Sequence, residues 1–318
     1  MALKIEVGPD FNFRGTVESH GWPGLLPFTW DGEAGRLERV ERLAPGRVVH
    51  LTISKKAGGG KAGGGAAGAA EASERGARAR GAGPGCLVIE TGGERLSPAE
   101  SAAVKARVRR MLRLDEDFSE FWAACRRQGR EDVARRHLGR MIRSTSVFED
   151  VVKVMLTVNT TWKRTKTMVA GLVEALGEPV AAVAGGGRAF PTPEAVAAAG
   201  EEFLRLELRY GYRSKSLAQL AQRVVAGDVD LEGLLDPRLD DAAVRRRLLD
   251  IRGVGPYAAA TTMALLGYYS HLAFDSEMIQ LVWKKIGKVK VTPADADKLY
   301  EQWGRWRYLG YLAEAYGW

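Results

Sequence analysis

Two kinds of hydrophobic periodicity divide the chain into a front and a back part. At 47–54, apolar Val49, Leu51 and Ile53 alternate with polar residues, as is typical of a strand buried on one face. The segment 86–91, CLVIET, has the composition of a partner strand. From residue 98 onward, apolar residues recur mainly at helical spacing. These patterns predict an α+β protein, with an antiparallel sheet domain at 1–97 and a mainly helical domain at 98–318.

Two stretches of biased composition interrupt these patterns. Residues 57–85 are rich in glycine and alanine and hold too little apolar surface to form a packed core. We therefore expect a disordered insertion there, between the two strands of a hairpin. Residues 184–200 are rich in glycine, alanine and proline, and they predict a long loop between two helices.

The most informative local pattern is a glycine hairpin between two predicted helices. Apolar residues at helical spacing predict the first helix over 241–251, and the hairpin Gly253-Val254-Gly255 follows it. Glycines permit positive φ and a close approach of another backbone. Pro256 suits the first turn of a second helix, which Gly267 can end. Because the first N–H groups of a helix are unpaired, the hairpin is a candidate for binding a DNA phosphate.

An isolated aspartate, Asp275, lies twenty residues after Gly255 and begins another stretch of apolar periodicity. Such an aspartate can simply be the N-cap of the next helix. Its position after a phosphate-binding hairpin suggests a second function, in which the carboxylate acts on a nucleotide that the hairpin brings beside it. Both interpretations remain open at this point.

The segment 248–278 resembles the helix-hairpin-helix, glycine/proline-rich loop and aspartate unit of the HhH-GPD superfamily of base-excision DNA glycosylases. In that family an aspartate lies eighteen residues after the position where some members carry a catalytic lysine. Here those two positions are Tyr257 and Asp275. The resemblance implies a sheet domain fused to a helical glycosylase domain, and double-stranded DNA containing a damaged base as the partner.

Further segments extend the resemblance to the 8-oxoguanine glycosylase branch. Asn159 falls where that branch inserts an asparagine into the gap left by a flipped nucleotide, and Arg164 falls where an arginine reads the partner base. Tyr212 and Arg213 resemble the tyrosine-arginine pair of the same branch. The remaining candidates, expected to line a base pocket, are Trp162, Tyr257 and Thr261.

The chain also resembles a plant-type, uncharacterised group of these proteins. The motifs of that group have counterparts at 19–21 (SHG), 148–150 (FED) and 274–277 (FDSE). One departure is Glu277, which stands where many relatives carry a histidine that can serve a phosphate. A negative charge there would weaken binding if it pointed at the DNA backbone.

Composition narrows the expected partners and cofactors. The formal net charge of +8 suits an anionic partner, although the excess is spread along the chain. Two cysteines, Cys86 and Cys125, indicate a reducing compartment and exclude a four-cysteine iron–sulfur cluster. The four histidines show no metal-ligand spacing. We expect no cofactor or metal beyond a structural monovalent cation at the hairpin.

The same composition bears on location and assembly. No signal peptide and no apolar run of membrane length is visible in the sequence. We expect an intracellular monomer, cytoplasmic and nucleoid-associated if the protein is bacterial.

The expected chemistry is the removal of a base in base excision repair. Hydrolysis of an N-glycosidic bond passes through an oxocarbenium-like sugar, which a nearby carboxylate stabilises; Asp275 is the candidate. A helix N-terminus should favour its ionised form. Because Tyr257 cannot form a Schiff base, we expect a monofunctional glycosylase, acting on an oxidised or alkylated purine. The alternatives are a non-catalytic damaged-DNA-binding protein on the same fold and a bifunctional glycosylase/AP lyase.

Overall fold

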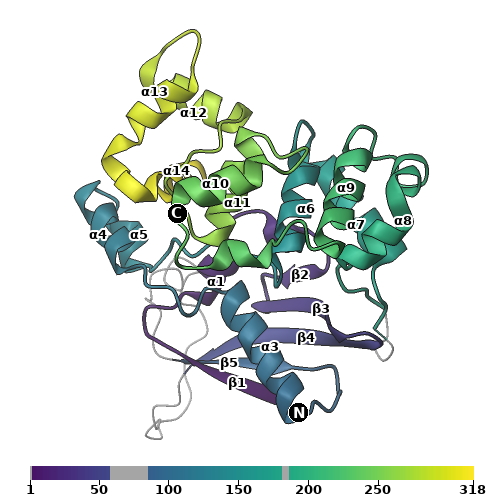
Figure 1. Cartoon of the computed structure of the whole chain (residues 1–318). Coiled ribbons are helices and arrows are strands. Elements are labelled where there is room, and N and C mark those ends of the chain that lie inside the picture. Colours follow the sequence, from purple (N-terminus) through teal and green to yellow (C-terminus); the bar gives the residue numbers. More distant parts are fainter. Residues whose placement is uncertain (1, 58–84, 181–185) are drawn as a thin grey trace, which may run out of the picture.

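Five strands form one antiparallel sheet in the front part of the chain (Figure 1). The computed structural model describes residues 2–57, 85–180 and 186–318. The strand order is β1-β5-β4-β3-β2. The strands are β1 (Ala2–Val7), β2 (Phe28–Asp31), β3 (Arg36–Ala44), β4 (Arg47–Ala57) and β5 (Gly85–Glu90).

The predicted pair of strands is confirmed. β4 and β5 pair antiparallel from Thr52 opposite Glu90 to Ala57 opposite Gly85. The alternating pattern has the expected effect, because the side chains of Val49, Leu51 and Ile53 are almost completely buried. The predicted insertion falls, at 58–84, outside the described residues.

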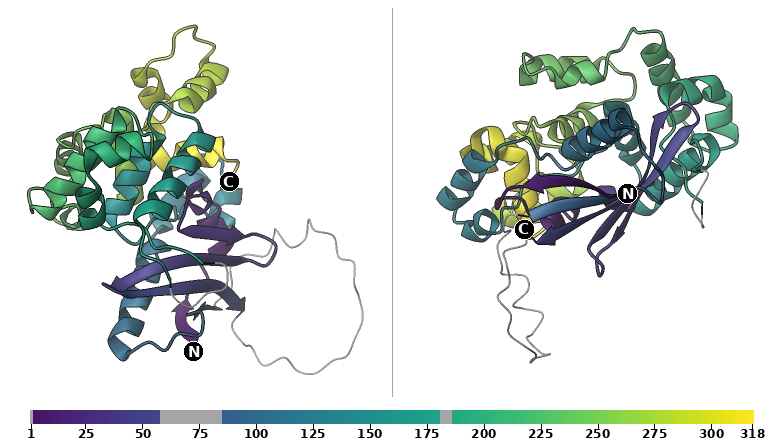
Figure 2. Two further views of the ribbon diagram at one scale, coloured as in Figure 1. Left: turned by 90° about the vertical axis from the view of Figure 1, so that its right-hand side faces the viewer. Right: turned by 90° about the horizontal axis from the view of Figure 1, so that it is seen from below.

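Helices form most of the described chain after residue 97, as the periodicity predicts. Figure 1 shows α3 lying across the sheet, and α12 and α13 projecting from the rest; Figure 2 shows the same projection from a second side. The helices are α1 (Phe13–Val17), α3 (Pro98–Met111), α4 (Ser119–Arg127), α5 (Glu131–Arg135), α6 (Val147–Thr157), α7 (Trp162–Leu176), α8 (Pro193–Leu206), α9 (Arg213–Val225), α10 (Asp241–Leu249), α11 (Pro256–Leu266), α12 (Ser276–Ile286), α13 (Pro293–Leu299) and α14 (Arg307–Ala315), with short 3₁₀ segments η1 (Trp22–Gly24), η2 (Glu232–Leu235) and η3 (Glu301–Trp306).

The loop predicted at 184–200 is correct only in part: residues 184–185 lie outside the described residues, 186–192 form a connection without helix, and the rest is helical. Helix α8 begins at Pro193, and the Thr192 hydroxyl caps it by accepting from the Ala195 N–H. A threonine followed by proline is a strong signal for a helix start, and here it prevails over the glycine- and alanine-rich composition. One glycine of this segment, Gly200, does interrupt the regular helix, because its positive φ of 74° kinks α8.

The two helices around the hairpin lie where the sequence predicts them. α10 ends at Leu249, α11 begins at Pro256, and Gly267 ends α11 in the left-handed region with φ 106°. Gly253 also has a positive φ of 86°, whereas Gly255 is extended with φ −89°. No side chain caps the N-terminus of α11, so its first N–H groups are left for another partner.

The other end of α11 is buried and is held by two arginines. Arg113, which is 1% exposed, donates to the carbonyl oxygens of Ala264 (2.8 Å) and Leu265 (2.6 Å). Arg143 donates to the carbonyl of Leu265 as well, at 3.2 Å. Both guanidinium groups pair with the Glu116 carboxylate. Carbonyls that water cannot reach thereby find charged donors, and the position of α11 is set from its C-terminal end.

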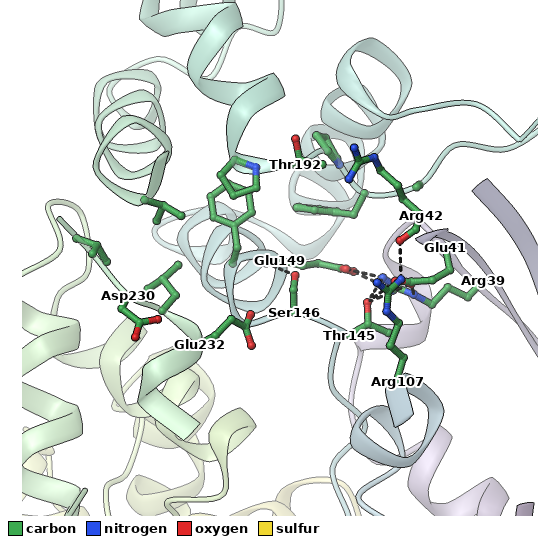
Figure 3. A pocket seen from close by; sticks show the side chains of 18 of the residues that line it. Arg39, Glu41, Arg42, Arg107, Thr145, Ser146, Glu149, Thr192, Asp230 and Glu232 are labelled. Atoms are coloured by element: carbon green, nitrogen blue, oxygen red, sulfur yellow. Dashed lines mark hydrogen bonds and ion pairs between the residues drawn. The ribbon is translucent and has the colours of Figure 1, made fainter. Parts of the chain in front are cut away.

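A buried ion cluster joins the sheet to the helical part (Figure 3). The Arg39 guanidinium of β3 contacts Glu149 of α6 at 2.6 Å and Glu41 at 2.6 Å. On α6, the Lys153 ammonium lies 2.6 Å from the same Glu149 carboxylate. Burial alone would raise the pKa of Glu149, but the charges of Arg39 and Lys153 outweigh burial and lower this pKa to about 2. One hydrophobic core runs across the same boundary and includes Leu37 of β3 and Met155 of α6.

We expect Glu149→Gln to destabilise the fold strongly, since it leaves Arg39 and Lys153 buried without their shared counter-charge. The loss should be roughly 3–5 kcal/mol in urea unfolding. Because the folded pKa of Glu149 is lowered, its contribution is complete above the usual pKa of 4.5 and is lost as the pH falls toward 2. The exposed pair Arg126–Glu131 supplies the control: Glu131→Gln should change the stability by about 1 kcal/mol at most. Equal effects of the two substitutions would contradict the importance of the cluster.

Candidate active site

A pocket of about 750 Å³ surrounds Asp275. Its walls come from the ends of α6, α7, α11 and α12, from α14, and from the turn that precedes η1. Five of the candidate site residues line it, although they are spread over more than a hundred positions: Asn159, Trp162, Tyr257, Thr261 and Asp275.

Asp275 is the N-cap of α12, and its carboxylate accepts a hydrogen bond from the Met278 N–H at 2.8 Å. It also faces the pocket, so the cap and the site are the same residue. The expectation that the helix terminus favours the ionised carboxylate is wrong in its net direction. Burial raises the pKa of Asp275 above its usual value, and the opposing hydrogen bonds from the backbone do not fully compensate.

Tyrosines form much of the wall around this carboxylate. Four tyrosines line the pocket: Tyr257 at the start of α11, Tyr308 and Tyr311 of α14, and Tyr316 just after that helix. Burial raises the pKa of Tyr257, with Asp275 as a further cause, so the phenol stays protonated at neutral pH. Among the described residues that line the pocket there is no lysine or arginine, while two carboxylates, Asp275 and the exposed Glu277, are present.

The candidates for filling the gap in DNA lie at one rim of the pocket. Asn159 is exposed between α6 and α7 and has a positive φ of 48°. Arg213, at the start of α9, donates to the carbonyl oxygens of Val158 and Asn159 and lies over the ring of Tyr212, which is 65% exposed. Asn159, Tyr212 and Arg213 therefore form one connected, solvent-facing group.

Arg164 lies close to this rim but does not line the pocket. Its side chain is exposed on α7 and donates to the carbonyl of Arg209 at 3.1 Å. This hydrogen bond links α7 to the loop that carries Tyr212. Arg164 and Arg213, the two arginines expected to contact the opposite base, thus lie on the same side of the protein.

The glycine hairpin packs against the helices that present this rim. A Cβ added at Gly253 would lie 2.8 Å from the Ser216 side chain on α9 and 3.1 Å from Met155 on α6. A Cβ at Gly255 would meet nothing within 4 Å. Gly253 is thus required by the fold of the hairpin, whereas Gly255 leaves an open backbone surface that an incoming phosphate can approach.

The sheet domain contributes a pocket wall that the sequence reasoning missed. His20 and Gly21, from the turn before η1, and Trp22, the first residue of η1, line the pocket. The Trp22 indole donates to Asp150 of α6 at 2.9 Å, which anchors this turn. A Cβ on Gly21 would come within 2.6 Å of Trp162, so the indole of Trp162 packs directly on the turn. The SHG motif at 19–21 was the available signal, but nothing in the sequence showed that it reaches Asp275.

A second cavity, of about 530 Å³, lies around the ion cluster and is separate from this pocket (Figure 3). Several of its charged side chains form ion pairs with one another: Arg39 with Glu149, and Arg39 and Arg107 with Glu41. It contains none of the candidate residues.

No group of three or more histidine, cysteine, aspartate or glutamate residues in the described ranges could hold a metal ion. The monovalent cation expected at the hairpin stays a prediction. Within those same ranges, no helix is long and apolar enough to span a membrane.

Comparisons with known proteins agree with this geometry. Residues 152–303 match the family described as HhH-GPD superfamily base excision DNA repair protein. A search of curated proteins finds no match. Among solved structures, a 3-methyladenine DNA glycosylase from Archaeoglobus fulgidus superposes with a TM-score of 0.70 at 19% identity, over 98% of each chain. An 8-oxoguanine glycosylase/lyase from Clostridium acetobutylicum gives 0.68 at 16% identity, over 99% of this chain and 96% of the other.

At these identities the superpositions establish the fold, which extends over almost the full length of both chains. The family match covers the segment from the middle of α6 to η3, and so contains the hairpin, Tyr257 and Asp275. Fold, family match and the arrangement of the pocket point the same way: residues 152–303 form a region that matches the HhH-GPD superfamily of base excision DNA repair proteins, and the chain has the fold of solved DNA glycosylases.

Proposed function

We propose that this protein is a monofunctional DNA glycosylase that flips a damaged purine into the pocket around Asp275 and hydrolyses its N-glycosidic bond. The observation that carries this proposal is the pair Asp275 and Tyr257 in one pocket. A carboxylate is available to stabilise the sugar, and a tyrosine occupies the position where a lysine would form a covalent adduct.

The proposed mechanism uses the Asp275 carboxylate electrostatically. As the bond from C1′ to the base lengthens, the base leaves with the bonding electrons and positive charge develops on the sugar. An ionised Asp275 beside C1′ stabilises this charge, and water then adds to C1′ to give an abasic site. The partly desolvated surroundings that raise the pKa of Asp275 also strengthen its attraction to the sugar cation.

The proposed DNA contacts follow from the same surface. The open N-terminus of α11 at Gly255 would bind a phosphate, while Asn159 and Tyr212 would occupy the space that the flipped nucleotide leaves. Arg164 and Arg213 would donate to the base left unpaired on the other strand. We further propose that the protein binds double-stranded DNA as a monomer, inside the cell, without a catalytic cofactor.

Of the two purine classes expected, the pocket composition favours alkylated bases. An alkylated purine such as 7-methylguanine carries a positive charge. The two carboxylates and the aromatic rings of the tyrosines would both attract this charge. A neutral oxidised purine gains less from these groups. The 3-methyladenine glycosylase that shares this fold supports the same choice. Because an 8-oxoguanine glycosylase/lyase also shares the fold, an oxidised purine is included among the substrates to be tested.

The central test is base release from duplexes that each carry 7-methylguanine, 3-methyladenine, 8-oxoguanine, uracil or no lesion. We expect an alkylated purine to be released fastest. Asp275→Asn should lower that single-turnover rate by at least about a hundredfold, with the fold intact because asparagine is also a good N-cap. The wild-type rate should fall at low pH as Asp275 is protonated, with a midpoint above the usual 3.8 because its pKa is raised.

The outcomes separate the alternatives. Unchanged release by the Asp275→Asn variant would refute the mechanism. Preferential binding of one lesion without release of any base would instead identify a non-catalytic damage-binding protein.

Borohydride trapping tests the monofunctional assignment. Since Tyr257 offers no amine, the wild-type protein should give no covalent adduct with damaged or abasic DNA, and the strand should break only after alkali treatment. A trapped adduct together with direct strand cleavage would establish the bifunctional alternative. A known glycosylase/lyase, assayed in parallel, shows that the trapping conditions work.

Gly255→Ala tests the phosphate contact at the hairpin. The added methyl group meets open space in the free protein, so the melting temperature should not change. On DNA the methyl group would hinder the close approach of a phosphate, and we expect roughly tenfold weaker binding to damaged and undamaged duplexes alike. Gly171→Ala, in α7, adds the same methyl group with only ordinary contact to Leu208 and should leave binding unchanged. A loss confined to one lesion would contradict a backbone contact.

A further inference from the structure

His20 is the one histidine among the described residues that lines the Asp275 pocket, and it comes from the sheet domain. The mechanism proposed above makes no use of it. Its ring lies against that of Trp22, with centroids 5.1 Å apart and planes tilted by 31°, and Trp22 is in turn held by Asp150. The neighbouring backbone is also held, because the Trp318 indole donates to the Ser19 carbonyl at 3.3 Å. The imidazole is therefore positioned from both sides.

The hydrogen bonds around Ser19 determine which ring nitrogen carries the proton. The Ser19 hydroxyl oxygen accepts from the Ile142 N–H at 3.1 Å and lies 2.9 Å from Nδ1 of His20. Having accepted one hydrogen bond, the hydroxyl uses its own proton best by donating to Nδ1. Burial, assisted by the charges of Arg113 and Lys153, lowers the pKa of His20 to about 3, so the ring is neutral at physiological pH. A neutral ring that accepts at Nδ1 carries its proton on Nε2.

The Nε2 atom of His20 is buried and has no hydrogen-bond partner in the part of the chain that the structure describes. An unpaired buried donor costs free energy, and the ring cannot turn toward another partner without losing Ser19 and Trp22. The imidazole as a whole is only partly buried and lines the pocket, so a small shift of the surrounding side chains lets a hydrogen-bond acceptor in the pocket reach Nε2 and recover this cost. A site built around such a donor discriminates strongly, because a ligand without the acceptor leaves the donor unpaired.

We propose that His20 is a specificity-determining residue, whose Nε2–H donates to an acceptor on the edge of the flipped base. The ligand class is a purine with a keto oxygen or an unprotonated ring nitrogen at that edge. A base that presents an N–H group there places two donors face to face and is rejected. This proposal rests on the proposed function, since it assumes that a flipped base occupies the pocket.

The test is a double-mutant cycle between protein and base. His20→Phe keeps a ring against Trp22 but removes the donor, and His20→Gln restores an N–H at a similar reach. The substrates are the purine that the wild-type protein releases best and analogues in which O6, N3 or N7 is removed in turn. We expect His20→Phe to slow release of the parent base about tenfold and to leave one of these analogues unaffected. His20→Gln should recover part of the loss.

His50→Phe is the matched control, because His50 lies on β4 outside the pocket. It should leave every rate unchanged. The tautomer is checked directly by ¹⁵N NMR: the His20 ring should carry its proton on Nε2 and should not titrate between pH 5 and 8. Equal slowing of all bases by His20→Phe would mean a structural role only, and would overturn the proposal, as would no slowing at all.

Duplexes with non-hydrolysable 2′-fluoro nucleotides of the same bases keep this test independent of catalysis. If the wild-type protein releases no base, the proposed function fails, but affinities for these duplexes still report recognition in the pocket. Weaker binding of the parent base by the His20→Phe variant, with no change for one analogue, supports the role of His20. The same affinity of both proteins for all duplexes refutes it.

Discussion

The carbonyl groups at a buried helix end cannot be left to water, and α11 meets this constraint at its C-terminal end with arginine side chains from distant parts of the chain. Arg113 and Arg143 hydrogen-bond to the carbonyls of its last turn, and Glu116 balances their charge. Its opposite end has no side-chain cap and faces the hairpin. The negative, C-terminal end of the helix dipole is therefore balanced by arginines inside the protein. The positive, N-terminal end has no cap at the surface, where an anion can bind.

The sheet domain depends on the same principle of internal charge balance. Arg39 of β3 enters the helical part and meets Glu149, which also holds Lys153. Since separating the sheet from α6 would break the buried ion pair between Arg39 and Glu149, the sheet and α6 keep one relative position. That position matters at the pocket, because the His20–Trp22 turn from the sheet domain forms one wall and the end of α6 forms another.

The sequence predicts well what local patterns encode. The strand pair at 47–57 and 85–90, the helices around the hairpin and the cap at Asp275 follow from periodicity and from single capping residues. Five of the candidate residues line one pocket. Their spacing along the sequence does not show that they meet there, and the family resemblance is what grouped them as one site. What could not be predicted depends on tertiary packing: the wall from His20, and the net direction of the pKa of Asp275, where burial prevails over the helix terminus. The start of α8 is predicted as loop because of its glycine- and alanine-rich composition, although Thr192 and Pro193 are typical of a helix start.

The contact between Trp318 and Ser19 spans 299 positions, and it lies beside the turn that completes the pocket. Ser19 and Trp318 come from opposite end regions of the sequence, and bringing them together closes a very long loop. This wall of the pocket is therefore complete only when both end regions have come together, so it depends on the whole fold and not on any local segment.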